Sequence, residues 1–485
     1  MMRAGDSIPS TIDISLPQRR IAYAAAAILL GQAIWIGRAG FSPIAMALIT
    51  TAIALTAIGL FACDSPIVRR LPPGALRWLL IAGILAALAR LPMIGLFVQF
   101  PRSRATLMPF VALAMIAIVL IACIQLLRSR FLTAAAFGLL VAAHFLMGAW
   151  YLGISPDPHC DVYLAQRLGC EELLQRRDPF AMTIPDIYGP TARFYPAGAV
   201  VNGQLQSGYF YPPLSLVLDV PAYLAGDVRY AHLFALSLTA LLIGFTRRDD
   251  GSSGVRFAPA IIVMFTPGIF WILENAWIDP FLLLMLSATV CFASRGRFKL
   301  AAAAFGLFLV GKQYAPFTVL AVPLLLQAMR KAEPRRPATS RLALASIAAG
   351  AVVTLPFFVW NPRAFLHSLI SIYVGVLRPD SNTFLPLLAR TFNWHPSLAL
   401  TTAVALTAGA LVAWRAPRTL DGFAAGIAFI LLCIFAFSTQ AFGNYYFLAS
   451  GALLAAIVAP AVGRDRFASD RRPMGRNATA EGAPR

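Results

Sequence analysis

The stretch "FLTAAAFGLLVAAHFLMGAWYLGISPDPHCDVYLAQRL", residues 131–168, joins an apolar segment directly to a polar one. Residues 131–154 are long enough to cross the hydrocarbon core of a bilayer as a helix, which takes about 20 residues. The polar part that follows brings Asp157, His159 and Asp161 within a few residues of the end of that segment. The stretch therefore predicts a membrane span that leads straight into a loop with chemically active side chains.

Apolar segments of this kind recur along the whole chain. Hydrophobic residues make up 59% of the sequence and charged residues 13%, whereas soluble domains carry about 25% charged residues. The short alternating segments of a membrane β-barrel do not occur. We therefore expect an all-α polytopic membrane protein with apolar segments at about 21–37, 41–63, 76–98, 106–127, 131–154, 210–226, 229–246, 258–273, 280–294, 300–311, 314–329, 342–360, 396–414, 420–438 and 444–463.

The positive charges decide which of these segments cross. The net charge is +19, but the arginines lie in short turns and in the tail, which indicates the positive-inside rule and not nucleic-acid binding. Every arginine cluster falls on the cytoplasmic side if 210–226 does not cross and if 300–311 and 314–329 cross separately. The segment 210–226 also holds three prolines and Asp219, and an aspartate within a span costs about 2.5–3.5 kcal/mol. We predict about fourteen spans, with 210–226 re-entrant or juxtamembrane.

This topology predicts a domain organisation. Residues 1–20 form a cytoplasmic segment, 21–130 an extra four-helix membrane module, 131–463 the main transmembrane core and 464–485 a disordered basic cytoplasmic tail. Both termini are then cytoplasmic, and two long external loops lie at 155–228 and 361–395. Loops of this length inside a compact protein are usually functional. The Arg-rich, Lys-poor composition suits a GC-rich bacterial source, so we expect a bacterial plasma (inner) membrane protein.

Polar side chains gather at the predicted external ends of the spans, whereas the cytoplasmic turns hold mostly arginine. Such one-sided clustering of carboxylates, cations, amides and tyrosines predicts a binding site at the external boundary of the bilayer. The candidate residues are Asp157, Asp161, Tyr211, Glu274, Asp279, Lys312, Gln313, Arg378, Asp380, Asn444 and Tyr445.

This set of residue types fits the transfer of a group from a lipid-linked donor. A lipid phosphate at headgroup level needs cations, which Lys312 and Arg378 would supply. An acceptor hydroxyl needs a base close to its proton, and a carboxylate at the membrane edge is suitable.

The motifs resemble those of the integral-membrane GT-C glycosyltransferases, most closely glycosyltransferase family 87, whose members use polyprenyl-phosphate sugars. The resemblance is carried, in chain order, by "DVYLAQRL", "RRDPF", "YFYPPL", "ENAWIDPF", "GKQY", "LPFFVWNPRAF" with "RPDS", and "FGNYYFL". It covers about 131–463 and implies that this part is a GT-C-like catalytic core. Arg177 stands where the family usually has glycine. The resemblance also implies that an aspartate in the first large external loop acts as general base, which maps to Asp161, with Asp157 as the second choice.

Several candidates also have a purely structural interpretation. Asp161 could cap the first turn of a surface helix, and Asp157, between two prolines, could form a turn. Lys312 could extend its side chain to the interface, Tyr445 could belong to an interfacial aromatic belt, and Asp380 could orient Arg378.

Metal and cofactor chemistry find little support in the sequence. His159 has no partners at metal-ligand spacing, so we expect no metal site and no cofactor, and a divalent cation, although possible, is not supported. Cys160 and Cys170 fall in the same predicted external loop, where a disulfide is chemically permitted. The sequence does not decide whether they are bonded.

The leading hypothesis is therefore an inverting glycosyltransferase with Asp161 as general base. It would move a sugar, such as mannose or another hexose or pentose, from a polyprenyl-phosphate donor to a glycan or glycolipid acceptor on the external face of the membrane. Two alternatives stay open: a lipid or sugar transporter or flippase, and a ligase that joins a polysaccharide to a lipid. Transporters, however, place polar residues near the bilayer midplane.

Overall fold

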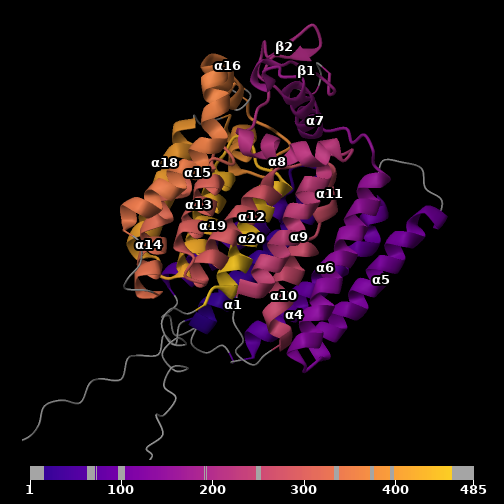
Figure 1. Cartoon of the computed structure of the whole chain (residues 1–485), viewed down its shortest axis with the longest axis vertical. Helices are drawn as coiled ribbons and strands as arrows, with labels where there is room; N and C mark the ends of the chain where they lie inside the picture. The colour runs from indigo at the N-terminus through magenta and orange to yellow at the C-terminus, as the bar shows by residue number, and fades with distance from the viewer. Residues whose placement is uncertain are drawn as a thin grey trace, which may run out of the picture.

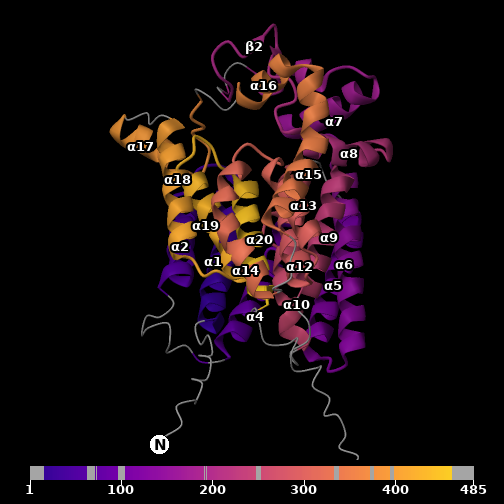
Figure 2. The same cartoon turned by 60° about the vertical axis from the view of Figure 1, so that its left-hand side comes forward.

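The computed structural model describes residues 16–62, 72, 74–96, 104–189, 192, 194–246, 253–332, 338–371, 376–393 and 398–460. The predicted tail at 464–485, most of the predicted segment 1–20 and several of the arginine-bearing turns lie outside these residues. Helices dominate the described part of the chain, and Figures 1 and 2 show most of them aligned side by side in one bundle. The prediction of an all-α polytopic membrane protein is confirmed.

The N-terminal part contains the helices before the opening stretch. They are α1 (Leu16–Ile36), the 3-10 turn η1 (Gly37–Ala39), α2 (Pro43–Phe61), α4 (Ala75–Leu88), η2 (Leu91–Leu96) and α5 (Arg104–Leu126). Helix α1 packs against α2 and against the C-terminal helix α20 (Gly443–Val458). The helices of the predicted extra module therefore pack directly against later helices of the chain, α1 among them.

The opening stretch folds as the sequence predicts. Helix α6 (Arg130–Gly153) is followed by α7 (Asp161–Leu174), η3 (Pro179–Ala181), three two-residue strands and α8 (Pro213–Leu224). The strands β1 (Ile184–Pro185), β2 (Val200–Val201) and β3 (Gln204–Leu205) form an antiparallel sheet in the order β1-β3-β2. Figure 1 shows that this sheet, α7 and α16 (Pro362–Ile370) lie together at one end of the bundle.

Helix α8 occupies the segment that the charge pattern excludes from crossing. In Figure 2 it lies across the end of α9 beneath α7, not along the bundle. Its Asp219 is fully buried, and an Asp219 carboxylate oxygen lies 3.2 Å from Nε2 of His232. Burial without a partner would be costly, so this pair explains how an aspartate fits inside an otherwise apolar helix.

The remaining helices form the greater part of the bundle. They are α9 (Arg229–Thr246), α10 (Ser253–Met264), α11 (Ile269–Glu274), α12 (Asp279–Ser294), α13 (Phe298–Leu309), η4 (Ala315–Ala321), α14 (Val322–Ala332), α15 (Thr339–Trp360), α17 (Phe384–Phe392), α18 (Leu398–Arg415) and α19 (Leu420–Ala436). The apolar segment 258–273 is broken between α10 and α11 at Pro267 and Gly268, where Gly268 has a left-handed φ of 88°. Proline and a left-handed glycine both end helices.

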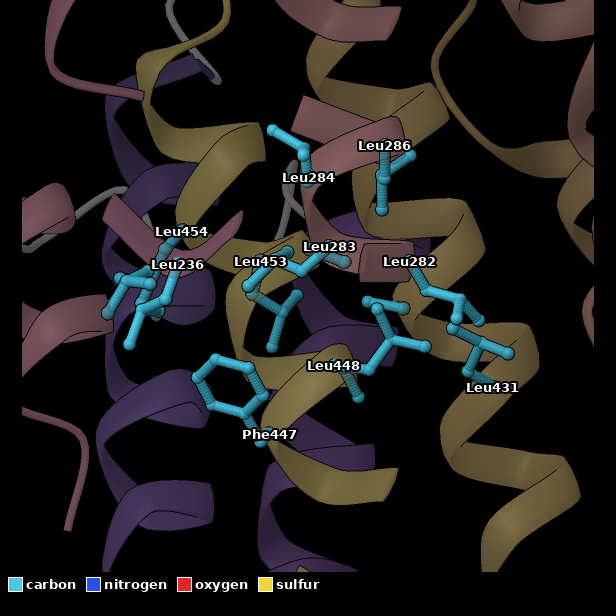
Figure 3. Packing of buried hydrophobic residues seen from close by; sticks show 14 of the residues in the cluster. Leu236, Leu282, Leu283, Leu284, Leu286, Leu431, Phe447, Leu448, Leu453 and Leu454 are labelled. Atoms are coloured by element: carbon cyan, nitrogen blue, oxygen red, sulfur yellow. The ribbon is translucent and has the colours of Figure 1, made fainter. Parts of the chain in front are cut away.

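The centre of the bundle is packed with leucine. Figure 3 shows leucines of α9, α12, α19 and α20 packed close together, among them Leu236, Leu283 and Leu453. All three are fully buried. Within the described residues, seven helices have the length and composition of a membrane span, and six shorter apolar helices accompany them. The count of about fourteen spans remains a prediction.

Candidate active site

A cavity of about 320 Å³ lies at the end of the bundle that carries α7 and the large loop. It brings together stretches that are far apart in the sequence, including the turn after α1. Its lining residues are Gly37, Arg38, Gly40, His159, Cys160, Asp161, Val162, Tyr188, Phe194, Tyr195, Phe210, Tyr211, Trp271, Asn275, Trp277, Arg378, Asp380, Gln440, Phe442, Asn444 and Tyr445. The polar turns predicted to share one face therefore converge on one cavity.

Asp161 is the first residue of α7 and faces this cavity. The N-cap of α7 is Cys160, whose side chain makes no capping bond. The Asp161 carboxylate instead accepts hydrogen bonds from the hydroxyl groups of Tyr188, at 3.2 Å, and Tyr195, at 2.9 Å. Asp161 is thus oriented by two tyrosines from the following loop.

The two tyrosines stay protonated donors. Burial, followed by the negative charge of Asp161, raises the pKa of both phenols. The backbone N–H of Asp161 also donates to the Tyr188 hydroxyl at 3.2 Å. The carboxylate is consequently held in a fixed orientation at the cavity surface, as a proton acceptor in catalysis must be.

Arg378 lies in the wall of the same cavity and is held in a fixed position. Its guanidinium donates two hydrogen bonds to the carboxylate of Asp380, at 2.9 and 2.8 Å, and stacks on the ring of Phe194 at 3.9 Å. Burial lowers the pKa of Arg378, but the hydrogen bonds and charge of Asp380 outweigh this and raise it. The expectation that Asp380 orients Arg378 agrees with these contacts.

Lys312 has a different environment. Its ammonium donates to both carboxylate oxygens of Asp279, at 3.1 and 2.9 Å, and the two side chains are 2% and 0% exposed. Asp279 also accepts from Tyr314 at 2.6 Å and from the Asn444 amide. Lys312 does not line the cavity but lies 4.2 Å from the ring centroid of Tyr445, which does. The lysine therefore belongs to a closed ion pair behind the cavity wall.

The other predicted residues divide into two groups. Tyr211, Asn444 and Tyr445 line the cavity together with Asp161, Arg378 and Asp380. The remaining ones lie elsewhere: Asp157 is exposed, Glu274 accepts hydrogen bonds from Tyr151 and Ser155, and Gln313 donates to the carbonyl of Phe210 at 2.8 Å. Glu274 and Gln313 therefore act, in this structure, through contacts within the protein.

Sequence reasoning missed several residues of the cavity. Tyr188 and Tyr195 lie in the long loop without a motif, and Trp271 lies within an apolar segment. Arg38 carried a usable signal, because the predicted topology puts the turn at 37–40 on the external side, where the positive-inside rule does not favour arginine.

Cys160 and Cys170 are both buried free thiols. Burial, and then the charge of Asp161, raises the pKa of the Cys160 thiol to about 12. Among the described residues, no three His, Cys, Asp or Glu side chains lie close enough together to hold a metal ion. The ring of His159 packs edge-on against Tyr188, at 5.4 Å between centroids.

Comparison with known proteins identifies part of the chain. Residues 209–434 match the model of glycosyltransferase family 87. No relative was found among curated protein sequences. A crystal structure of ArnT from Cupriavidus metallidurans bound to undecaprenyl phosphate aligns with a TM-score of 0.41 and 19% sequence identity, and the alignment covers 66% of this chain and 59% of that one. The match over residues 209–434 confirms the resemblance to glycosyltransferase family 87 that the motifs indicate.

Proposed function

We propose that the protein moves a sugar from a polyprenyl-phosphate donor to an acceptor hydroxyl on the external face of a bacterial plasma membrane. The observation that supports this most strongly is the placement of Asp161 and Arg378 in the wall of one cavity. In one cavity, the carboxylate can accept a proton from the acceptor hydroxyl while the guanidinium binds the phosphate of the donor.

The proposed reaction is a single displacement. Asp161 accepts the proton of the acceptor hydroxyl while that oxygen forms a bond to the anomeric carbon of the donor. The bond between the anomeric carbon and the phosphate oxygen breaks, and its electron pair leaves with the polyprenyl phosphate. One displacement inverts the configuration at the anomeric carbon. Arg378, held by Asp380, stabilises the charge that develops on the leaving phosphate.

Lys312 takes an indirect part in this proposal. Its ammonium is already bound to Asp279, so it is not available as a phosphate ligand without breaking a buried ion pair, which is costly. The pair instead anchors Asn444 through Asp279 and supports Tyr445 by a cation–π contact. Both of these residues line the cavity, so the pair acts by keeping the wall in shape.

The aromatic walls favour sugars as substrates. Tyr188, Tyr195, Tyr211, Trp277 and Tyr445 all line the cavity. Aromatic rings present apolar faces with polar edges, which suits the flat, partly apolar faces of hexoses and pentoses. The proposed acceptor is therefore a glycan or glycolipid, and mannose is one candidate for the transferred sugar.

The test uses the full chain reconstituted into vesicles with defined donors. A polyprenyl-phosphate sugar should yield product with inverted anomeric configuration, determined by NMR, while the matching polyprenyl-diphosphate sugar should not. Asp161→Asn, in protein that is correctly inserted, should lose transfer. Movement of the lipid-linked sugar across the vesicle membrane without bond formation would establish a transporter. Transfer of a polysaccharide from a polyprenyl-diphosphate-linked donor would establish a ligase.

A further inference from the structure

The turn at the end of the first helix reaches the proposed active site. Arg38, in η1, lines the same cavity as Asp161 and Arg378, and Gly37 and Gly40 line it on either side of Arg38. This turn lies more than a hundred residues before the segment that matches family 87, which begins at residue 209. The N-terminal helices therefore contribute a cation to a cavity whose other lining residues come from the loop around Asp161, from the family-matched segment and from residues 440–445.

Asn382 fixes this turn against the segment that carries Arg378. The Asn382 side chain is buried, accepts a hydrogen bond from the Ser42 N–H at 2.9 Å and donates to the carbonyls of Gly37, at 2.9 Å, and Gly40, at 3.2 Å. A Cβ atom at Gly37 would lie only 2.5 Å from Nδ2 of Asn382. Such a close approach requires glycine, so the position of Arg38 relative to Arg378 is built into the fold.

The Arg38 side chain is itself held in place. Its guanidinium stacks on the Trp35 ring at 3.8 Å and donates to the Trp35 carbonyl. Arg90 lies 5.8 Å from the same ring centroid and donates to Gln32 at 3.0 Å. Both arginines line a smaller cavity of about 30 Å³ next to the large one. Two guanidinium groups on one tryptophan concentrate positive charge beside the cavity, and a bound anion would be attracted there.

The charges of the cavity wall lead to the same conclusion. Its charged side chains are Arg38, Arg378, Asp161 and Asp380, and Asp380 is already bound to Arg378. A phosphodiester donor brings one negative charge, and a second develops on the phosphate as the sugar leaves. The positive charge of Arg378 is already offset by Asp380, and Asp161 adds a further negative charge to the cavity wall. A bound phosphate would therefore lack a compensating cation without Arg38.

We propose that Arg38 binds the phosphate group of the lipid donor, as a second phosphate ligand beside Arg378 that comes from the N-terminal helices. This inference rests on the proposed function in assuming a phosphate-bearing lipid. Arg38 gives a planar, two-pronged donor for phosphate oxygens. It also assigns a role to α1 and η1, since without them the donor site would lack one of its two cations.

Direct binding tests this proposal without any need for turnover. The full chain is placed in nanodiscs, and dissociation constants are measured for undecaprenyl phosphate, undecaprenol and inorganic phosphate. The wild type should prefer undecaprenyl phosphate clearly over the other two. Arg38→Gln should weaken binding of undecaprenyl phosphate by about 10- to 100-fold, the value of a hydrogen-bonded charge, and leave that of undecaprenol unchanged. Arg167→Gln removes an exposed arginine of α7 at the same end of the bundle and should change neither.

The outcomes separate the two proposals. If the wild type prefers undecaprenyl phosphate but Arg38→Gln binds it equally well, the role of Arg38 is wrong and the proposed function stands. If the wild type does not distinguish undecaprenyl phosphate from undecaprenol, both are wrong. Competition by inorganic phosphate at similar concentrations would overturn the assignment to a lipid phosphate. Should Arg38→Gln fail to fold, Arg38→Lys decides: binding weakened severalfold supports the proposal, and unchanged binding contradicts it.

Discussion

Two carboxylate–cation pairs lie at the same end of the bundle, and their environments differ. Asp279 and Lys312 are 0% and 2% exposed and satisfy each other together with Tyr314 and Asn444. Asp380 and Arg378 are 34% and 15% exposed and line a cavity that also contains Asp161. Both pairs lie in polar stretches that the sequence predicts to be external. The first is closed to ligands, and the second faces the space where substrates would bind.

The difference shows how to separate structural from functional charges near a membrane surface. A buried ion pair with all its polar groups satisfied contributes rigidity, and removal of one partner leaves an uncompensated charge. A pair at a cavity surface keeps hydrogen-bonding capacity for a ligand. Mutations of the first pair should therefore change stability, and mutations around the second should change turnover.

The largest effect on turnover is expected at Asp161. Asp161→Asn should lower kcat by about 10²- to 10⁴-fold, the usual contribution of a general base, while the melting temperature changes little. Asp157→Asn is the matched control, since Asp157 lies four residues earlier, is exposed and does not line the cavity. It should keep wild-type activity. Loss of activity in Asp157→Asn together with full activity in Asp161→Asn would show that Asp157, and not Asp161, is the general base.

Breaking the closed pair should affect stability instead. Lys312→Met leaves the Asp279 carboxylate buried without its cation and should destabilise the protein by about 3–5 kcal/mol. Denaturant unfolding in detergent measures this directly. The double variant Lys312→Met/Asp279→Leu should recover part of the loss, because it removes both charges. A Lys312→Met protein with unchanged stability but no donor binding would show that Lys312 contacts substrate.

Arg378→Lys keeps the charge in the open pair but removes the planar fork. We expect the KM for the donor to rise about tenfold or more, because lysine cannot bind Asp380 and a phosphate with the same fixed geometry. The kcat should fall less than in Asp161→Asn. Steady-state kinetics with varied donor give both values, and an unchanged KM would exclude Arg378 from the donor site.

A smaller effect is expected when one tyrosine loses its bond to Asp161. Tyr195→Phe removes the donor at 2.9 Å from the carboxylate but keeps the ring. The kcat should change by about 2- to 10-fold, the range of a single hydrogen bond, with little change in donor KM. Phe194→Leu tests the support of the other proposed substrate contact, Arg378, on which Phe194 stacks. This variant should change the donor KM and leave kcat nearly unchanged.

The smallest effect concerns thiol chemistry. Cys160 is buried and burial raises the pKa of its thiol to about 12, so it should resist alkylation at pH 8 in the folded protein. A cysteine introduced at the exposed position 157 should react readily with a membrane-impermeant reagent, provided that the loop is external. Mass spectrometry of labelled peptides distinguishes the two sites. Rapid labelling of Cys160 would contradict the closed packing beneath Asp161.

Much of the fold follows from the sequence, because apolar length and charge position are local properties. The segments at 131–154 and 229–246 correspond to α6 (Arg130–Gly153) and α9 (Arg229–Thr246). The exclusion of 210–226 from crossing came from the placement of the arginines, together with the prolines and Asp219 of the segment, and α8 lies across the bundle end (Figure 2). The small sheet was missed, because two-residue strands are too short for an alternating pattern.

The site was predictable only in part. The order of the motifs and their shared external face predict that Asp161, Arg378 and Tyr445 lie close together, and all three line one cavity. The sequence does not show whether a charge is satisfied by a distant partner, so Lys312 seemed equivalent to Arg378. Tyr188 and Tyr195 were missed, since the loop that brings them to Asp161 has no regular structure from which a spacing could be read.

Turnover per folded molecule in Asp161→Asn and Asp279→Asn, measured side by side with a polyprenyl-phosphate sugar, tests the central comparison most directly. Both substitutions remove one negative charge at the same end of the bundle. We predict that Asp161→Asn folds normally and loses transfer, whereas Asp279→Asn is destabilised and its folded fraction still transfers sugar. Transfer retained by Asp161→Asn and lost in folded Asp279→Asn would contradict the account and move the chemistry to the buried pair.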